Sequence, residues 1–412
     1  MKYFILIPDG MADRPNRSLN NRTPMEAAHK PNMDMLASES LCGTVSNVPE
    51  GMVPESDTAN LSILSYNPKI YSKGRSPLEA MSMGIDMKEN DTAIRCNIVT
   101  LSGTADDDYA SRTMIDHSSG DITTEEADEL VKALNEALPM DGRHLYTGVS
   151  YRHCLIWDGA DEKYQFSRPH DILGRTISEY LPRVDNGGKE FLEFMEEGAR
   201  VLDNHPVNVS RRKRGLRPAN SPWLWSPGKK PSLPKFEDKW HLKTAIISAV
   251  DLIKGIGICA GCDVINVPGA TGNYHTNYSG KAEAAIKAFS DHDLVYVHVE
   301  APDECGHQGN PGEKTSSIEK IDELILGPVL GYLKDSGENF RIMVLPDHPT
   351  PLELRTHSKE PVPFFIYDSE KSFSGPSAFT EKKASEFPLY IEDGSNLMGI
   401  LTSEDITEKT LE

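Results

Sequence analysis

Short apolar runs recur along the chain, and most of them have the length of a buried β-strand. The first is Phe4–Ile7, in a predicted strand over residues 3–7 that ends at Pro8-Asp9-Gly10. A continuous apolar run followed by an acidic loop is typical of a parallel sheet covered on both faces. Similar runs alternate with predicted helices in the last third of the chain. There we expect helices over 242–254, 279–290 and 314–335, and strands over 263–267, 293–299, 340–345 and 362–367.

The middle of the chain has a different order of elements, typical of a separate α+β domain. We expect a strand over 92–101, strands near 144–158 and a helix near 187–202. A further helix over 123–137 is indicated by capping threonines and two glutamates in its first turn. Residues 217–236 are rich in Pro, Gly, Ser and Trp, which suits a linker or a structured binding loop. The pattern predicts a discontinuous core of residues 1–86 and 228–412, interrupted by an inserted domain of residues 87–227.

Composition narrows the class of protein. The chain has 412 residues, enough for two domains, with 38% hydrophobic and 26% charged residues. A formal charge of −20 argues against nucleic acid or an anionic membrane as the main partner. The apolar runs are too short to span a membrane. Because the chain enters a strand almost at once, we expect no signal peptide and a cytoplasmic location. Oligomeric state is left open.

Three of the predicted strands deliver an aspartate at their carboxyl ends: Asp9, Asp303 and Asp347. The open-sheet rule places such ends at an active-site edge. Histidines accompany the second and third aspartates, namely His307, His348 and His357. A lone Asp after a strand is usually a cap or a turn residue, so the weight lies in the joint occurrence. Carboxylates mixed with imidazoles suit Zn, Mn or a similar cation better than Ca.

Ser56 lies between two acidic residues in the segment Pro54–Asn60, just before a helix that we expect from Thr58 to Leu64. A helix N-terminus favours an anion near the Ser hydroxyl. A serine does not attack phosphorus unaided at neutral pH. Two divalent cations held by Asp and His would remove its proton and shield the charge of a phosphate.

Two other features of the sequence do not decide the function. A basic cluster is either a solvated loop or a clamp for phosphate or carboxylate groups; it comprises Arg211, Arg212, Lys213, Arg214 and Arg217. Only Cys259 and Cys262 among the six cysteines have a metal or redox spacing. No second pair accompanies them, so we expect plain thiols.

The order Asp, Ser, Asp-x-x-x-His, Asp-His, His resembles the alkaline phosphatase superfamily. In particular, it resembles the archaeal-type cofactor-independent phosphoglycerate mutases. The resemblance runs nearly end to end and is carried by Ile7–Asp13, Glu55–Asn60, Gly269–Gly272, Asp303–His307 and Leu345–His348. It implies a three-layer α/β core with a mainly parallel sheet, plus a smaller inserted α+β domain that acts as transferase domain or lid.

The resemblance also implies roles for single residues. Ser56 would be the nucleophile that becomes phosphorylated. Asp303, His307 and His357 would hold one metal ion, and Asp9, Ser56, Asp347 and His348 the other. Mn²⁺ is the expected metal, with Zn²⁺, Co²⁺ and Mg²⁺ as alternatives, and no 2,3-bisphosphoglycerate is needed. The substrate would be a small phosphorylated molecule, 3-phosphoglycerate, which gives its phosphoryl group to the serine and takes it back on the 2-hydroxyl.

That mechanism requires cationic groups to hold the glycerate while the serine is phosphorylated. The candidates are Arg75, Arg95, Arg152, His153 and Arg214, with Lys243 expected near the serine on the core side. Trp223-Leu224-Trp225 and Ser248–Leu252 also resemble a bacterial branch proposed to include homoserine kinases. The alternative function is therefore a metal-dependent phosphotransferase or phosphatase on another small substrate. A non-catalytic binding protein is disfavoured, because the nucleophile and every apparent ligand are present.

Overall fold

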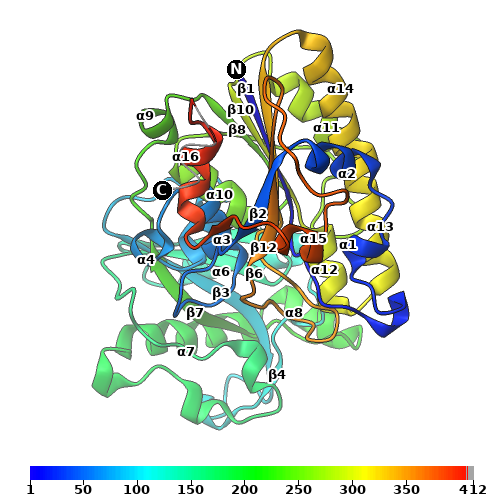
Figure 1. Cartoon of the computed structure of the whole chain (residues 1–412). Helices are drawn as coiled ribbons and strands as arrows, with labels where there is room; N and C mark the ends of the chain where they lie inside the picture. Colours follow the sequence, from blue (N-terminus) through cyan, green and yellow to red (C-terminus); the bar gives the residue numbers. More distant parts are fainter. Residues whose placement is uncertain (405, 407–412) are drawn as a thin grey trace. The chain divides into compact units, whose positions relative to one another are not determined.

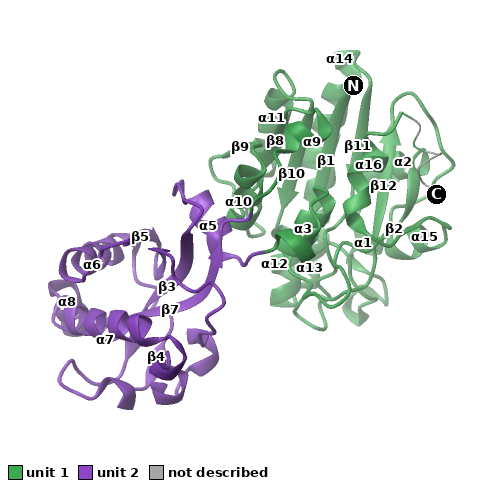
Figure 2. Ribbon diagram, turned by 90° about the vertical axis from the view of Figure 1, so that its left-hand side faces the viewer, with its two compact units in different colours: residues 1–72, 232–412 green, residues 73–231 purple. Residues whose placement is uncertain are grey.

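The computed structural model describes residues 1–404 and 406 and divides the chain into two compact units (Figure 2). Unit 1 comprises residues 1–72 and 232–412, and unit 2 comprises residues 73–231. The expected division lay at 86/87 and 227/228. The first boundary falls earlier because helix α5 (Ser76–Ser82) packs against strands of unit 2.

Unit 1 is built on an eight-stranded sheet in the order β13-β2-β12-β11-β1-β10-β8-β9. Strand β12 pairs antiparallel with β11 and β2, whereas the other described pairings are parallel. The strands are β1 (Lys2–Pro8), β2 (Leu41–Val45), β8 (Thr244–Ile247), β9 (Asp263–Ile265), β10 (Leu294–Val299), β11 (Phe340–Val344), β12 (Val362–Asp368) and β13 (Tyr390–Ile391).

Helices cover both faces of this sheet, which makes unit 1 a three-layer α/β structure (Figure 1). One layer contains α3 (Ser56–Ile63), α9 (Phe236–Trp240), α10 (Asp251–Cys259) and α16 (Leu397–Leu401). The other contains α1 (Pro24–Ala27), α2 (Pro31–Ser38), α11 (Tyr278–Ala288), α12 (Ala301–Gln308), α13 (Pro311–Ile321), a π-helical turn (Asp322–Leu326) and α14 (Gly327–Ser336). Short helices α4 (Pro68–Tyr71) and α15 (Glu381–Ser385) complete the unit.

The apolar runs of the sequence become the centre of this sheet. Phe4, Ile5, Leu6 and Ile7 of β1 have no exposed surface, because β1 lies between β10 and β11 and under both helix layers. Side chains alternate between the faces of a strand, so a strand buried on both faces is apolar at most of its positions. This is why the predicted strands of the last third are correct in type.

The predicted helix over 242–254 is wrong. Residues Thr244–Ile247 form β8, and a helix, α10, begins only at Asp251. The β8 side chains are fully or almost fully buried. A short apolar run cannot be assigned to helix or strand by periodicity alone. Here parallel pairing with β10 and β9 decides in favour of a strand.

Unit 2 contains an antiparallel five-stranded sheet; α6 and α7 pack against one face of it, and the short α5 packs against β3 and β7 on the side of Arg95. Its strands are β3 (Asp91–Leu101), β4 (Met114–Asp116), β5 (Arg143–Val149), β6 (Arg152–Asp158) and β7 (Ser221–Lys229). Its longer helices are α6 (Thr124–Ala137), α7 (Lys189–Asp203) and α8 (Pro206–Lys213). The cap at Thr123 is confirmed, since its side chain accepts from the Glu126 amide. Cys96, Leu155 and Trp157 point into the core beneath α6 and α7.

The linker expected over 217–236 is instead largely strand β7. It pairs with β3 along most of its length, and Trp223 and Leu224 are buried. Two prolines fit in β7 because it pairs only with β3, and an unpaired edge tolerates the missing N–H. The composition of the segment is that of a loop, but its two aromatic residues and Leu224 supply the burial that holds a strand.

Three of the five residues of the basic cluster, Arg211, Arg212 and Lys213, lie in α8, and three carboxylates of unit 2 pair with its four arginines. Arg211 and Arg214 pair with Glu126, Arg212 pairs with Asp203, and Arg217 pairs with Asp116. The interpretation as a solvated loop is wrong for the first part of the cluster, which is helical. The interpretation as a clamp gains no support from these contacts, because each arginine named here already has a carboxylate partner.

The expected fold class is confirmed: a three-layer α/β core with a mainly parallel sheet is interrupted by a smaller α+β unit. All six cysteines are free. Within the described residues, no helix combines the length and the apolar character that crossing a membrane requires.

A half-buried carboxyl group gives this fold a pH-dependent stability. Glu381 accepts hydrogen bonds from the Asp13 amide (3.0 Å) and the Thr23 hydroxyl (2.8 Å). Burial raises the pKa of Glu381 from 4.5 to about 7, against the effect of these bonds. A raised folded-state pKa gives stability that is complete below the unfolded pKa and is lost as pH rises through the folded value.

We therefore expect the free energy of unfolding of the parent to fall as the pH rises from about 5 to about 8. In the Glu381→Gln variant this fall should be smaller by roughly 2–3 kcal/mol. The glutamine keeps an acceptor for the Asp13 amide and carries no charge. Urea unfolding of both proteins at the two pH values measures the difference. Parallel pH profiles would show that Glu381 is not the responsible group.

Candidate active site

Three neighbouring strands at the centre of the sheet bring three aspartates to one edge. Asp9 directly follows β1, Asp347 follows β11, and Asp303 lies in α12, which begins directly after β10. The spacing Asp-x-x-x-His is helical here, so that Asp303 and His307 lie one turn apart in α12. The Asp9 amide donates to the Val299 carbonyl at 3.0 Å, which locks the ends of β1 and β10 together. All three aspartates are at least 96% buried.

One group of ligand atoms surrounds Asp303. Its carboxylate lies 3.2 Å from Nε2 of His307 and 3.3 Å from Nε2 of His357, and these two nitrogens are 3.0 Å apart. The other ring nitrogen of each histidine faces a backbone carbonyl: Arg355 at 3.0 Å and Pro54 at 2.6 Å. A carbonyl only accepts, so Nδ1 donates to it and Nε2 is the nitrogen directed at Asp303, where it would present its lone pair to a metal ion once deprotonated. This is the arrangement by which protein histidines bind metals.

A second group lies around Asp9. His298 Nε2 is 3.1 Å from Asp9 Oδ2, and His348 Nε2 is 3.7 Å from Asp9 Oδ1 and 3.6 Å from Asp347 Oδ2. Asp9 Oδ1 is buried and has no hydrogen-bond partner in the described structure. An unpaired carboxylate oxygen among further carboxylates is costly unless a cation neutralises it.

Ser56 lies at the first position of α3, two residues earlier than the expected helix start. Its Oγ is 3.2 Å from His348 Nε2 and 3.5 Å from Asp9 Oδ2. The first-turn amides of α3 are therefore next to the hydroxyl, where they favour a bound anion. The serine is in contact with the second group of ligand atoms.

The electrostatics of the site also fit divalent cations. Burial acts to raise the pKa of Asp303, but hydrogen bonds from His307 and His357 outweigh it and hold that pKa well below its usual range. The hydrogen bond between His307 and Asp303 is also the main cause that raises the pKa of His307 to about 9. Burial raises the pKa of Asp9 well above its usual range, and the neighbouring Asp347 adds to the effect. The site concentrates negative charge away from water, which divalent metal ions would offset.

Sequence reasoning missed three residues here: the buried His298 and Lys281, and the half-buried Glu300. Ligand atoms of Asp9, His298 and Asp347 lie within 4.8 Å of one another, as do those of Asp9, Glu300 and Asp303. Lys281 Nζ donates to the His298 carbonyl at 2.7 Å and has no exposed surface. The signal for His298 was present, since a histidine inside the apolar run Leu294–Val299 is a buried polar group that needs a partner.

Comparison with known proteins agrees with this geometry. The family model for 2,3-bisphosphoglycerate-independent phosphoglycerate mutase matches residues 37–208. The mutase of that name from Methanothrix thermoacetophila is 47% identical over 97% of this chain and 99% of its own length. Its counterpart from Methanosarcina barkeri is 45% identical over 97% of this chain and 99% of its own length.

The chain belongs to this phosphoglycerate mutase family.

Solved structures agree in fold. A protein from Pyrococcus horikoshii superposes with a TM-score of 0.81 at 30% identity, covering 98% of both chains. The cofactor-independent phosphoglycerate mutase from Thermoplasma acidophilum gives a TM-score of 0.69 at 30% identity, covering 97% of this chain and 99% of that one. The resemblance to homoserine kinase-like proteins is not favoured by these comparisons.

Five of the six residues expected to hold the substrate lie in unit 2, on different parts of it. Across β3 and β6, Arg95 pairs with Cys154 and Arg152 pairs with Asn97. Directly paired residues share a face, and Cys154 and Arg152 are two positions apart on β6, so both arginines lie on the same face of the sheet. Arg95 stacks on Trp225 at 4.6 Å and pairs with Glu79. His170 meets the edge of Trp225 at 5.5 Å. This face, opposite the one covered by α6 and α7, gathers cationic and aromatic groups, and α5 packs against part of it; we call it the open face.

Other predicted grip residues lie elsewhere. His153 is on the helix-covered face of β6, with Leu155 and Trp157, and burial lowers its pKa to about 4. Arg214 pairs with Glu126. Arg75 precedes α5 and forms interactions of its own.

Lys243 does not lie beside Ser56. It precedes β8 and pairs with Asp291 at 2.7 Å, at the amino ends of the parallel strands, whereas Ser56 lies at their carboxyl ends. The structure therefore does not support the prediction for Lys243, since β8 begins beside it at the opposite ends of the strands from Ser56. Lys281 is the lysine that contacts the site.

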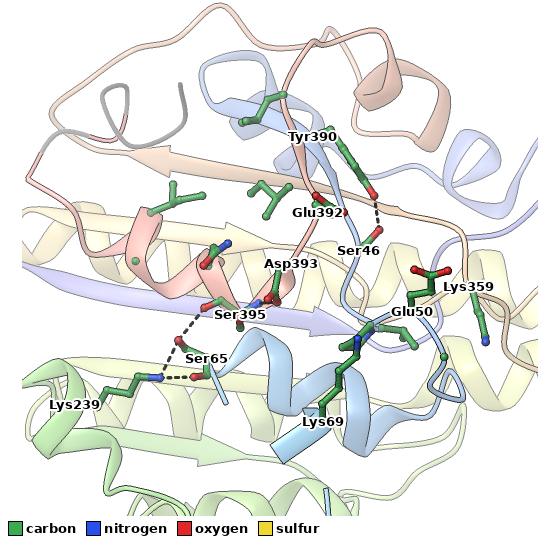
Figure 3. A pocket seen from close by; sticks show the side chains of 18 of the residues that line it. Ser46, Glu50, Ser65, Lys69, Lys239, Lys359, Tyr390, Glu392, Asp393 and Ser395 are labelled. Carbon is green, nitrogen blue, oxygen red and sulfur yellow. Dashed lines mark hydrogen bonds between the residues drawn. The ribbon is translucent and has the colours of Figure 1, made fainter. Parts of the chain in front are cut away.

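A cavity of about 1230 Å³ in unit 1 is lined by residues of loops, short helices and strand β13, and by none of the candidate ligands (Figure 3). Three lysines (Lys69, Lys239, Lys359) and three acids (Glu50, Glu392, Asp393) line it, so their charges offset one another. Lys239 is already bonded to Ser65 (Figure 3). We therefore assign the phosphate chemistry of the mutase to the carboxyl edge of the sheet and not to this cavity.

Proposed function

We propose that this protein interconverts 3-phosphoglycerate and 2-phosphoglycerate through a phosphoserine at Ser56, without 2,3-bisphosphoglycerate. The observation that carries the proposal is the position of Ser56 Oγ, 3.2 Å from His348 and 3.5 Å from Asp9, at the start of α3. The family of the chain and the chemistry of the neighbouring donor atoms agree with this role.

The donor set supports two divalent metal ions, and we propose how the chain would divide them. Asp303, His307 and His357 would hold one ion, and Asp9, Ser56, Asp347 and His348 the other. The mixture of imidazole nitrogen and carboxylate oxygen favours Mn²⁺, with Zn²⁺, Co²⁺ and Mg²⁺ as alternatives. When bound, two such ions lower the pKa of the serine hydroxyl and neutralise the phosphate in both transition states.

The chain's own residues perform the relay in two displacements. In the first, a bond forms between Ser56 Oγ and phosphorus while the bond from phosphorus to the 3-oxygen breaks, and the serine proton ends on the 3-hydroxyl of glycerate. In the second, the 2-oxygen attacks phosphorus, Ser56 leaves, and the proton of the 2-hydroxyl returns to Ser56. The α3 amides face the phosphoryl oxygens throughout.

Unit 2 is the proposed transferase domain, and its open face is the proposed grip on the glycerate. Arginine suits this role because its planar fork matches a carboxylate. Arg95 is oriented by Glu79 and Trp225; Glu79 occupies its Nε and Nη2, so Nη1 is the nitrogen that it would offer to a carboxylate. Arg152 is exposed on the open face, and its guanidinium carbon lies 5.5 Å from the centre of the Tyr151 ring. Glycerate that escapes after the first displacement would leave a phosphoserine that water hydrolyses.

We expect Arg152→Ala to raise KM for 3-phosphoglycerate about tenfold, as one lost charge-assisted bond implies. It should also raise the fraction of turnovers that release inorganic phosphate. Arg200→Ala is the matched control, because Arg200 is exposed on helix α7 of the same unit, on the covered side of the sheet. Equal kinetics for the Arg152 and Arg200 variants would remove Arg152 from the grip.

One assay tests the function itself. Purified protein with Mn²⁺ and 3-phosphoglycerate should form 2-phosphoglycerate with no added bisphosphoglycerate. Absence of product with every metal tried, together with ATP-dependent phosphorylation of homoserine, would contradict the proposal. We place the reaction in the cytoplasm, among small metabolites, and expect no nucleic-acid partner for a chain of charge −20.

A further inference from the structure

Asn60 joins the nucleophile to one of the candidate metal ligands. It lies one turn after Ser56 in α3 and has no exposed surface. Its Nδ2 donates to the Ser56 carbonyl at 2.8 Å and to Asp347 Oδ2 at 2.9 Å. Its Oδ1 accepts from the Tyr296 hydroxyl of β10. One amide thus links α3, β10 and the segment after β11.

The orientation of this amide is determined by its neighbours. A backbone carbonyl and a carboxylate only accept, so Nδ2 must face both of them. Tyr296 is completely buried, and burial raises its pKa well above the usual range, so its hydroxyl keeps its proton and donates to Oδ1. The reverse orientation would set Oδ1 against two acceptors. The amide therefore has one stable position.

The partner carboxylate is held on both of its oxygens. Asp347 Oδ1 accepts from the Gly10 amide at 3.1 Å and from the His348 amide at 2.9 Å, while Oδ2 accepts from Asn60. A carboxylate held in this way cannot rotate freely, so its free lone pairs keep a defined direction. The bond to the Ser56 carbonyl holds the first turn of α3, and with it the serine, against the same carboxylate.

We propose that Asn60 is a positioning residue for the phosphoryl relay: it fixes the Ser56 turn relative to Asp347, so that the hydroxyl and a metal ligand share one geometry. This inference rests on the function proposed above. Hydrogen-bonded groups that orient metal ligands typically change metal affinity or activity 10- to 100-fold when removed. Asn60 differs from an ordinary buried asparagine because both of its Nδ2 partners belong to the candidate site.

The test compares Asn60→Ala with a matched control, Asn208→Ala. Asn208 is equally buried, in unit 2, and also makes three hydrogen bonds, all of them to backbone groups. Mn²⁺ affinity is measured by titration calorimetry on metal-free protein, and kcat and KM for 3-phosphoglycerate are measured alongside. We expect Asn60→Ala to weaken Mn²⁺ binding and to lower kcat by about 10- to 100-fold each, with KM within about threefold. Asn208→Ala should change neither, although it lowers thermal stability.

A second variant tests the inference even if Asn60→Ala does not fold. Tyr296→Phe removes only the hydroxyl that holds Asn60 Oδ1 and should give a smaller loss of kcat, about threefold to tenfold. If Asn60→Ala folds and keeps the parental Mn²⁺ affinity and kcat, the inference is overturned. If Asn60→Ala does not fold, unchanged kinetics in Tyr296→Phe would overturn it. Failure of the parent protein to interconvert the phosphoglycerates would instead overturn the proposed function, and the calorimetry would still report on Asn60.

Discussion

Replacing Ser56 with alanine is expected to lower kcat by about 10⁴-fold or more, because covalent catalysis has no route without its nucleophile. The hydroxyl lies within reach of both His348 and Asp9, and no other serine hydroxyl of the described residues contacts either side chain. The metals should remain bound by the carboxylates and imidazoles. The assay is 2-phosphoglycerate formation, together with metal content after gel filtration.

Ser62→Ala is the matched control for this variant. Ser62 lies in the same helix, is completely buried, and its hydroxyl has no hydrogen-bond partner in the described structure. Removing such a hydroxyl is close to neutral for stability, so this variant should keep parental turnover. Near-normal turnover in Ser56→Ala would contradict a phosphoserine relay.

The second large effect is expected at Asp303. Asp303→Asn keeps the shape of the side chain but removes the charge that draws His307 and His357 together. We expect the number of bound Mn²⁺ ions to fall from two to one per chain. We also expect kcat to fall by about 10³-fold, since a catalytic metal contributes several kcal/mol of transition-state stabilisation. In metal-free protein the pKa of His307 should fall from about 9 toward its ordinary value.

Glu304→Gln is the control, because Glu304 is the next residue of α12 and accepts a hydrogen bond from Gln308, and its charge is only the smallest of the causes of the raised pKa of His307. It should bind two ions and keep parental activity. Calorimetry gives the stoichiometry, and NMR titration of the imidazoles gives the pKa. Two tightly bound ions in Asp303→Asn would contradict the division of ligands proposed here.

The candidate site was largely predictable because its main elements are local. An apolar run that ends in an aspartate identifies a central parallel strand and its carboxyl end at once, as at Asp9 and Asp347. Parallel strands then bring these ends together without any knowledge of the strand order. Ser56 was predictable through its acidic neighbours and the helix behind it, although the structure starts that helix at the serine itself.

What could not be predicted depends on pairing and register. Strand β8 is too short to be distinguished from a helix until its neighbours β10 and β9 are known. Strand β7 has the composition of a loop and is held by its pairing with β3. The register of β6 places His153 on the covered face and Arg152 on the open one. Asn60 was visible within a motif, but its link to Asp347 spans 287 residues.

The most direct test of the account is to look for the phosphoryl group on Ser56. Metal-loaded protein is mixed with 3-phosphoglycerate labelled in its phosphoryl group, quenched in acid within one turnover, digested and analysed by mass spectrometry. The account predicts label on the peptide that contains Ser56, and its disappearance into 2-phosphoglycerate as the quench is delayed. Formation of 2-phosphoglycerate with no label on Ser56 at any delay would contradict it.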